Sequence, residues 1–135
     1  MIGGLIVMHG KLGEELLNVL TIILGETANI EAISIGWYDD IEESKKKIAA
    51  SLKRVDQKSG VVIFTDMFGG TPSNLGFTFQ KAGGVEIITG ANLPMLIKFI
   101  SLQRGTSLRD VAKKVIEQGR KNIHLASAIL DGKKS

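Results

Sequence analysis

The sequence predicts an α/β fold: a doubly wound, mostly parallel sheet with helices on both faces. Short apolar or alternating segments of strand length recur along the chain, and segments with helical spacing of apolar residues separate them. Glycine, proline and polar residues stand between the two kinds of segment. Strand and helix units that repeat in this way form a parallel sheet covered by helices on both sides.

The first half of the chain contains three predicted strands. They span residues 2–8, 30–35 and 60–66. The first is a continuous apolar run, the second alternates, and the third is rich in β-branched and aromatic residues. Two helices, predicted from apolar residues at helical spacing, separate these strands and begin near Leu12 and Ile41. An acidic version of a capping box, at Asp39 or Asp40, opens the second helix.

The second half continues the pattern. A helix is predicted to begin at Thr71, a good N-cap residue that is followed by proline. Residues 85–90 form a fourth strand, and further helices open near Pro94 and after Ser107, where SLRD resembles a capping box. Residues 122–130 (NIHLASAIL) are predicted to be the last strand, and their alanines and serine favour an edge position.

Length and composition predict one domain, residues 1–130, followed by a polar tail at residues 131–135. The chain has no cysteine, no signal-peptide pattern and no apolar run near the ~20 residues of a membrane helix, so we expect a cytoplasmic protein. A net charge of +3 and few aromatic residues argue against nucleic-acid binding. Two histidines without cysteine argue against a zinc site, and no cofactor is expected.

His9 and Asp66 are the candidate catalytic residues. Each stands at the carboxyl end of a predicted strand. In a flavodoxin-like strand order, 2-1-3-4, these strands are neighbours, so the two side chains would meet in the crevice where such sheets bind ligands. A carboxylate bound to one ring nitrogen leaves the other nitrogen as a nucleophile or base. The alternative is a structural histidine and an aspartate that serves a turn.

The loop DMFGGTPSN, residues 66–74, is the candidate phosphate-binding element. Gly69 and Gly70 let the backbone approach a ligand closely. The helix that begins at Thr71 offers free N–H groups to an anion, and Thr71 and Ser73 add hydroxyl donors. An ordinary glycine turn with a helix cap is the alternative. The loop lacks the lysine and the spacing of a P-loop.

Three stretches together resemble the enzyme IIA component of the mannose family of the sugar phosphotransferase system, over about residues 1–130. They are LIVMHGKLGEELL, GVVIFTDMFGGTPSN and VEIITGANLPMLIKFI. The resemblance implies that His9 accepts a phosphoryl group from the histidine-containing phosphocarrier protein and passes it to a IIB component for sugar uptake. It also implies that Asp66 orients the histidine, and that Thr71 and Ser73 contact the phosphoryl oxygens.

The resemblance further implies how the chain assembles. Family members are typically dimers with an antiparallel last strand exchanged between subunits, so we expect a homodimer that uses residues 122–130, with no fused IIB domain after them. Membrane contact is expected only through the permease complex. An apolar rim around the histidine would bind the partner proteins, and its candidates are Phe68, Met95 and Leu96.

Two alternatives of different kinds remain. The phosphotransfer subunit of dihydroxyacetone kinase resembles the same fold and would share His9. A non-enzymatic, anion-binding regulatory module would bind a ligand without becoming phosphorylated. A receiver domain is disfavoured because MHGKLG lacks its acidic pair, and a histidine phosphatase because Met8 stands where that family carries arginine.

Overall fold

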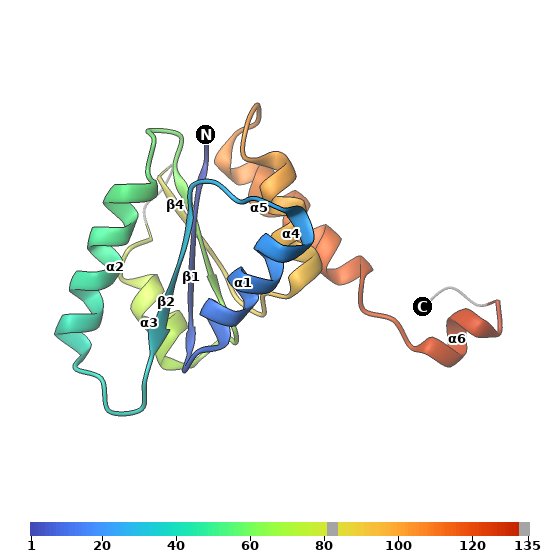
Figure 1. The fold of residues 1–135 in the computed structure, drawn as a ribbon, viewed down its shortest axis with the longest axis horizontal. Helices are drawn as coiled ribbons and strands as arrows, with labels where there is room; N and C mark the ends of the chain where they lie inside the picture. The colour runs from blue at the N-terminus through green and yellow to red at the C-terminus, as the bar shows by residue number, and fades with distance from the viewer. Residues whose placement is uncertain (81–83, 133–135) are drawn as a thin grey trace.

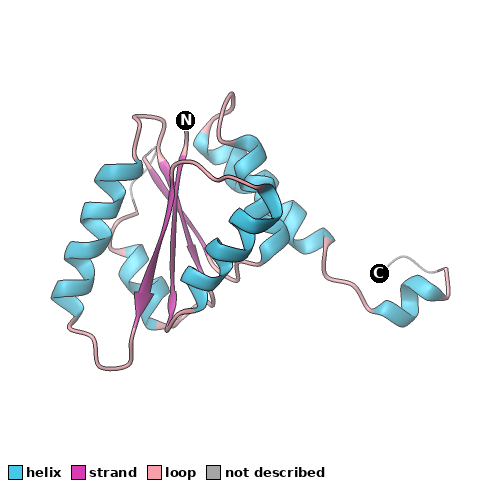
Figure 2. Ribbon diagram, in the orientation of Figure 1, coloured by secondary structure: helices cyan, strands magenta, loops and turns pink. Residues whose placement is uncertain are grey.

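Four parallel strands form one sheet in the computed structural model, which describes residues 1–80 and 84–132. The strand order is β2-β1-β3-β4, and the carboxyl ends of the strands share one edge (Figures 1 and 2). The strands are β1 (Gly3–His9), β2 (Ile30–Ile35), β3 (Val61–Thr65) and β4 (Val85–Ile88). The predicted doubly wound α/β fold is thereby confirmed.

Helices cover both faces of the sheet because side chains alternate between the faces along each strand. In β1, Leu5 and Val7 join the core on one face, whereas Ile6 and Met8 join the core on the other. The first face is covered by α2 (Ile41–Val55) and α3 (Thr71–Phe77). The second face is covered by α1 (Leu12–Leu24), α4 (Leu93–Leu102) and α5 (Leu108–Lys121).

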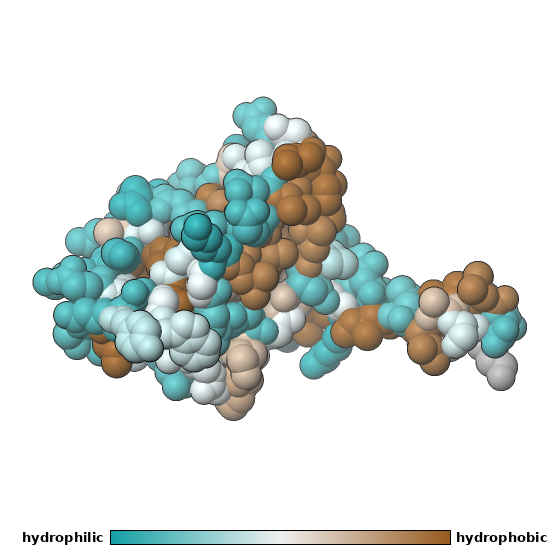
Figure 3. Space-filling model, turned by 60° about the horizontal axis from the view of Figure 1, so that its bottom comes forward, coloured by the Kyte–Doolittle hydropathy of each residue, from teal (hydrophilic) through white to brown (hydrophobic). Residues whose placement is uncertain are grey.

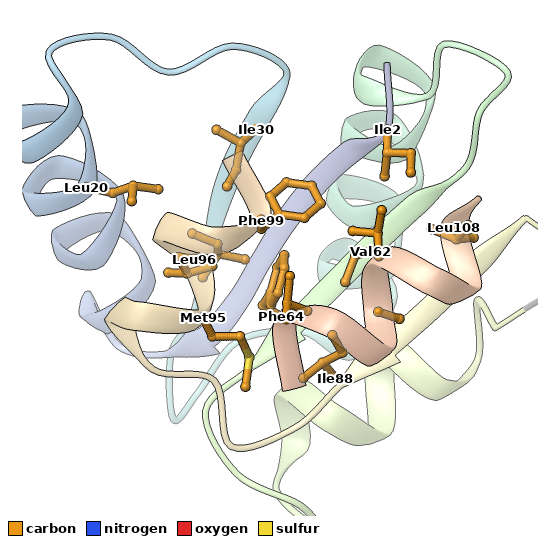
Figure 4. Close-up of a cluster of buried hydrophobic side chains, with 14 of the residues drawn as sticks. Ile2, Leu20, Ile30, Val62, Phe64, Ile88, Met95, Leu96, Phe99 and Leu108 are labelled. Atoms are coloured by element: carbon orange, nitrogen blue, oxygen red, sulfur yellow. The ribbon is translucent and has the colours of Figure 1, made fainter. Parts of the chain in front are cut away.

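The larger core lies between the sheet and the helices α1, α4 and α5 (Figure 4). At its centre Phe64 of β3 meets Phe99 of α4 edge to face, with ring centroids 5.1 Å apart. Both side chains are fully buried. Burying a side chain of this size stabilises the fold by about 1.5–3 kcal/mol. The contact therefore fixes β3, and with it the loop that follows β3, against the rest of the molecule.

Side-chain caps open three of the helices. The capping residues are Asp40 for α2, Asn92 for α4 and Ser107 for α5. The cap at Ser107 is the one that the sequence predicts, and Asp40 is one of the two predicted caps for α2. The start of α3 differs from the prediction, because its N-cap position is Gly70 and Thr71 is already helical.

The predicted last strand at residues 122–130, and with it the antiparallel pairing, is wrong. Residues Ala126–Leu130 instead form a short helix, α6. A strand needs a neighbouring strand for its backbone hydrogen bonds, whereas α6 makes its bonds locally, for example from the Ile129 N–H to the Leu125 carbonyl. Alanine also favours the helix intrinsically. Most of the expected tail, residues 133–135, lies outside the described residues.

Exposed hydrophobic side chains occur in the loops at the carboxyl edge of the sheet, and others gather on α1 and on residues 122–132, which we call the C-terminal arm. The arm stands away from the body of the molecule (Figure 1), and Figure 3 shows hydrophobic surface on α1 and on the arm. The exposed residues are Val19, Ile22 and Ile23 on α1, and Ile123, Leu125, Ile129 and Leu130 on the arm. Among the described residues, no helix has the length and apolar character needed to cross a membrane.

Candidate functional site

His9 and Asp66 lie together at the carboxyl edge of the sheet. His9 is the last residue of β1, and Asp66 directly follows β3. The strands are paired in register, with Val7 opposite Thr65, so the two chain ends reach the edge side by side. The strand order reverses between β1 and β3, which is where open α/β sheets bind ligands. The predicted meeting of the two side chains is confirmed, while their chemical role stays a prediction.

Asp66 holds His9 through two hydrogen bonds to one carboxylate oxygen. Its Oδ2 accepts from the His9 backbone N–H at 3.0 Å and contacts the ring Nδ1 at 2.8 Å. Its Oδ1 accepts from the Met67 N–H at 3.0 Å. An ionised carboxylate can only accept, so Nδ1 carries the proton and the neutral ring keeps its lone pair on Nε2. The geometry thus leaves Nε2 as the ring nitrogen with a free lone pair.

The carboxylate of Asp66 remains ionised at neutral pH. Burial by itself raises the pKa of this carboxyl, but the hydrogen bonds that it accepts from the backbone and the ring of His9 hold the pKa below its usual value. The side chain of His9 is 31% exposed and that of Asp66 13%. An ionised, partly buried carboxylate stabilises positive charge that develops on the ring when Nε2 bonds to an electrophile.

Gly69 and Gly70 serve the loop in different ways. Gly69 has a φ of +86°, a conformation that favours glycine. Gly70 has an ordinary extended backbone, with φ −86° and ψ 170°. However, a Cβ atom at Gly70 would lie 2.8 Å from Cε1 and 3.3 Å from Nε2 of His9. Gly69 therefore sets the loop conformation, and Gly70 leaves room beside Nε2 of His9.

The two hydroxyl residues of the loop have different surroundings. Ser73 is buried, and its Oγ accepts from the Gly69 N–H and donates to the Gly70 carbonyl, both at 3.0 Å. These bonds hold the loop in shape, and direct contact of Ser73 with a phosphoryl group stays a prediction. Thr71 is exposed, and together with His9 it lines a pocket of about 160 Å³. Its position is compatible with the predicted role.

The structure separates the three residues predicted to form an apolar rim. Phe68 is 75% exposed, and its ring lies beside Phe77 with centroids 5.8 Å apart. Met95 and Leu96 are buried in the core, so their assignment to the rim is wrong. The Asn92 cap fixes the start of α4, and the first turn of that helix directs both side chains toward the sheet.

Sequence reasoning missed Trp37, which lies in the loop between β2 and α2. Its ring centroid is 6.0 Å from that of His9, and it lines the same pocket as His9 and Thr71. The available signal was the sequence GWYDD directly after a strand, because two adjacent aromatic residues are unusual in a polar loop. In the part of the chain that the structure describes, no group of three or more His, Cys, Asp or Glu side chains could hold a metal ion.

Comparison with known proteins shows the family to which the chain belongs. Residues 3–116 match the family described as the PTS system fructose IIA component. The chain therefore belongs to the IIA components of the mannose and fructose family of the sugar phosphotransferase system. It is 26% identical over 132 residues to the fructose-specific EIIA component of Bacillus subtilis, covering 97% of this chain and 90% of that protein.

Two further comparisons give a longer relative and a solved structure with the same fold. The mannose-specific EIIAB component of Escherichia coli K12 is 28% identical over 122 residues, which are 89% of this chain but 38% of that protein. The chain thus spans well under half of this longer relative. The crystal structure of an EIIA component from Streptococcus agalactiae has the same fold, with a TM-score of 0.85 at 22% identity, covering 95% of this chain and 99% of the other.

Proposed function

We propose that the chain is a phosphoryl carrier in which Nε2 of His9 takes a phosphoryl group from the histidine-containing phosphocarrier protein and passes it to a IIB component for sugar uptake. The observation that carries this proposal is the 2.8 Å contact between Nδ1 of His9 and Asp66. It leaves Nε2 unprotonated beside the space that Gly70 keeps open. Membership of the IIA family supports the same role.

Because the proton of the His9 ring is on Nδ1, Nε2 is the atom that attacks in the transfer step. The lone pair of Nε2 attacks the phosphorus of the donor's phosphohistidine, a new N–P bond forms, and the donor's N–P bond breaks and returns its electron pair to the donor ring. The proton on Nδ1 of His9 stays in place, so the phosphorylated ring is cationic and Asp66 stabilises it. Transfer to the IIB component repeats the step in the forward direction and leaves His9 neutral again.

The surroundings of His9 fit transfer between two proteins. The imidazole is partly exposed, and the loop that begins with Asp66 carries the exposed apolar side chain of Phe68. Transient complexes of this kind can be small. In this proposal the chain works on the cytoplasmic side and reaches the membrane only through the permease complex, while Thr71 contacts the phosphoryl oxygens from the pocket.

Labelling tests the proposal directly. The full chain is incubated with radiolabelled phosphoenolpyruvate, enzyme I and the phosphocarrier protein, and we expect label that is labile in acid and stable in base. His9→Gln should lose the label, whereas the matched variant His124→Gln should keep it, because these are the two histidines of the chain. Label that survives in His9→Gln, or that is stable in acid, would contradict the assignment.

The same reaction separates the alternatives. A IIB component should remove the label from the phosphorylated chain. Removal only by the subunits of dihydroxyacetone kinase would favour that system instead. An anion-binding regulatory module would take up no label but would bind inorganic phosphate.

We further propose that the chain forms a homodimer through the C-terminal arm. Ile123, Leu125 and Leu130 of the arm expose 70%, 68% and 85% of their surface, and the arm stands clear of its own chain. Exposed apolar residues on such an arm favour burial against a second copy. Sedimentation should give a dimer for the full chain and a monomer for a chain that ends at Lys121. A full-length monomer at micromolar concentration, or a truncated dimer, would contradict this.

A further inference from the structure

Trp37 is almost fully exposed beside the candidate phosphoryl acceptor. Its side chain lies in the loop of residues 36–40 and is 90% exposed, although tryptophan is highly buried on average. Its ring makes an angle of 38° with the ring of His9 at a centroid distance of 6.0 Å. Together with the adjacent Tyr38, which is fully exposed, Trp37 gives this loop an apolar surface beside His9 that a second molecule can cover.

Backbone and side-chain hydrogen bonds fix this loop. The Asp39 carboxylate accepts from the Gly36 N–H at 2.7 Å, which closes the turn around Trp37. The Gly10 N–H donates to the Ile35 carbonyl at 2.8 Å, which ties the residue after His9 to the end of β2. The backbone that carries the indole is therefore held before any partner binds, and such preorganisation lowers the entropy cost of binding.

The loops that carry Trp37 and Phe68 follow the two strands on either side of β1. β1 lies between β2 and β3, so the loops that follow β2 and β3 flank the end of β1. Phe68 is 75% exposed and Trp37 90%, whereas the side chain of His9 is 31% exposed. The imidazole is thus less exposed than the aromatic side chains of the two flanking loops, and both of those side chains are available for contact with a protein that docks over His9.

We propose that Trp37 is a contact residue for the protein that donates the phosphoryl group, and that it packs on apolar surface around the donor's phosphohistidine. This inference rests on the proposed phosphoryl relay. Tryptophan is enriched among the residues that dominate binding at protein interfaces, because burying its large ring stabilises the complex. A free anion would gain little from an uncharged indole, so the exposed ring favours a protein as the ligand.

Steady-state kinetics with the phosphorylated phosphocarrier protein test the inference. Trp37→Ala should raise KM for this donor about tenfold or more, which is the cost of truncating an important interface side chain, and should change kcat less than about twofold. Trp37→Phe should restore most of the affinity. Ile22→Ala, which removes an exposed apolar side chain of α1, is the control and should leave KM unchanged.

Tryptophan emission gives a second, independent readout, because Trp37 is the single tryptophan of the chain. On titration with an unphosphorylated phosphocarrier protein that lacks tryptophan, the emission should move to shorter wavelength as the ring is buried. An unchanged KM in Trp37→Ala, or unchanged emission at saturation, would overturn the inference. Normal acid-labile labelling of His9 in either case would leave the proposed function standing, whereas an unlabelled wild-type chain would contradict that function itself.

Discussion

Asp66→Asn should slow phosphorylation of His9 by up to about 10⁴-fold, the size of the effect when the orienting carboxylate of a histidine-dependent site is replaced by an amide. The amide of asparagine can donate to Nδ1, which in the native chain faces Asp66 Oδ2 at 2.8 Å. That bond favours the tautomer with the proton on Nε2, so the nucleophilic lone pair is lost. The loss of charge also removes the stabilisation of the cationic phosphorylated ring. Rapid-quench labelling measures the rate.

Two further measurements on Asp66→Asn separate chemistry from folding. Nitrogen NMR of the His9 ring should show the proton moved from Nδ1 to Nε2. Thermal unfolding should show a folded protein, since the side chain lies at the edge of the sheet and takes no part in the apolar core. A transfer rate within about threefold of the native rate would mean that the carboxylate does not orient the nucleophile.

Gly70→Ala should reduce transfer by about a hundredfold or more, because misplacement of a reacting group by about 1 Å has effects of this size. The backbone of Gly70 is acceptable for alanine, but the new Cβ would lie 2.8 Å from Cε1 of His9. The ring must therefore tilt, and the methyl group also covers the approach to Nε2. The labelling rate of the variant measures the effect.

Gly69→Ala is the matched control, because at Gly69 an added Cβ has free space but the backbone conformation disfavours a side chain, whereas at Gly70 the reverse holds. A Cβ at Gly69 meets no neighbouring atom within 4 Å, but the φ of +86° strains any side chain. This variant should lose about 1–2 kcal/mol of unfolding free energy and retain more transfer activity than Gly70→Ala. Similar activity in the two variants would show that space beside Nε2 does not control transfer.

The fold was predictable because each of its parts has a local signal. The buried run of β1 and the β-branched run of β3 have the composition of buried strands. Asp40 and Ser107 marked helix starts from their own side-chain chemistry. The meeting of His9 with Asp66 then required only the rule that strand order places β1 next to β3.

The wrong and missed predictions concern residues whose burial or secondary structure depends on tertiary packing. Met95 and Leu96 follow a loop motif in sequence, but helical phase turns both into the core. The segment at residues 122–130 has apolar residues that suit either a strand or a helix, and without a neighbouring strand its backbone bonds form locally. The sequence GWYDD marked Trp37 as unusual, but its place beside His9 depends on the pairing of β2 with β1.

The nitrogen that carries the phosphoryl group tests the central claim most directly. The full chain, labelled with ¹⁵N and phosphorylated by the phosphocarrier protein, can be examined by phosphorus and nitrogen NMR at neutral pH. Because Asp66 holds the proton on Nδ1, we expect the phosphorus to couple to Nε2 of His9, with Nδ1 still protonated. Phosphorus on Nδ1 of His9, or on any other residue, would contradict the account.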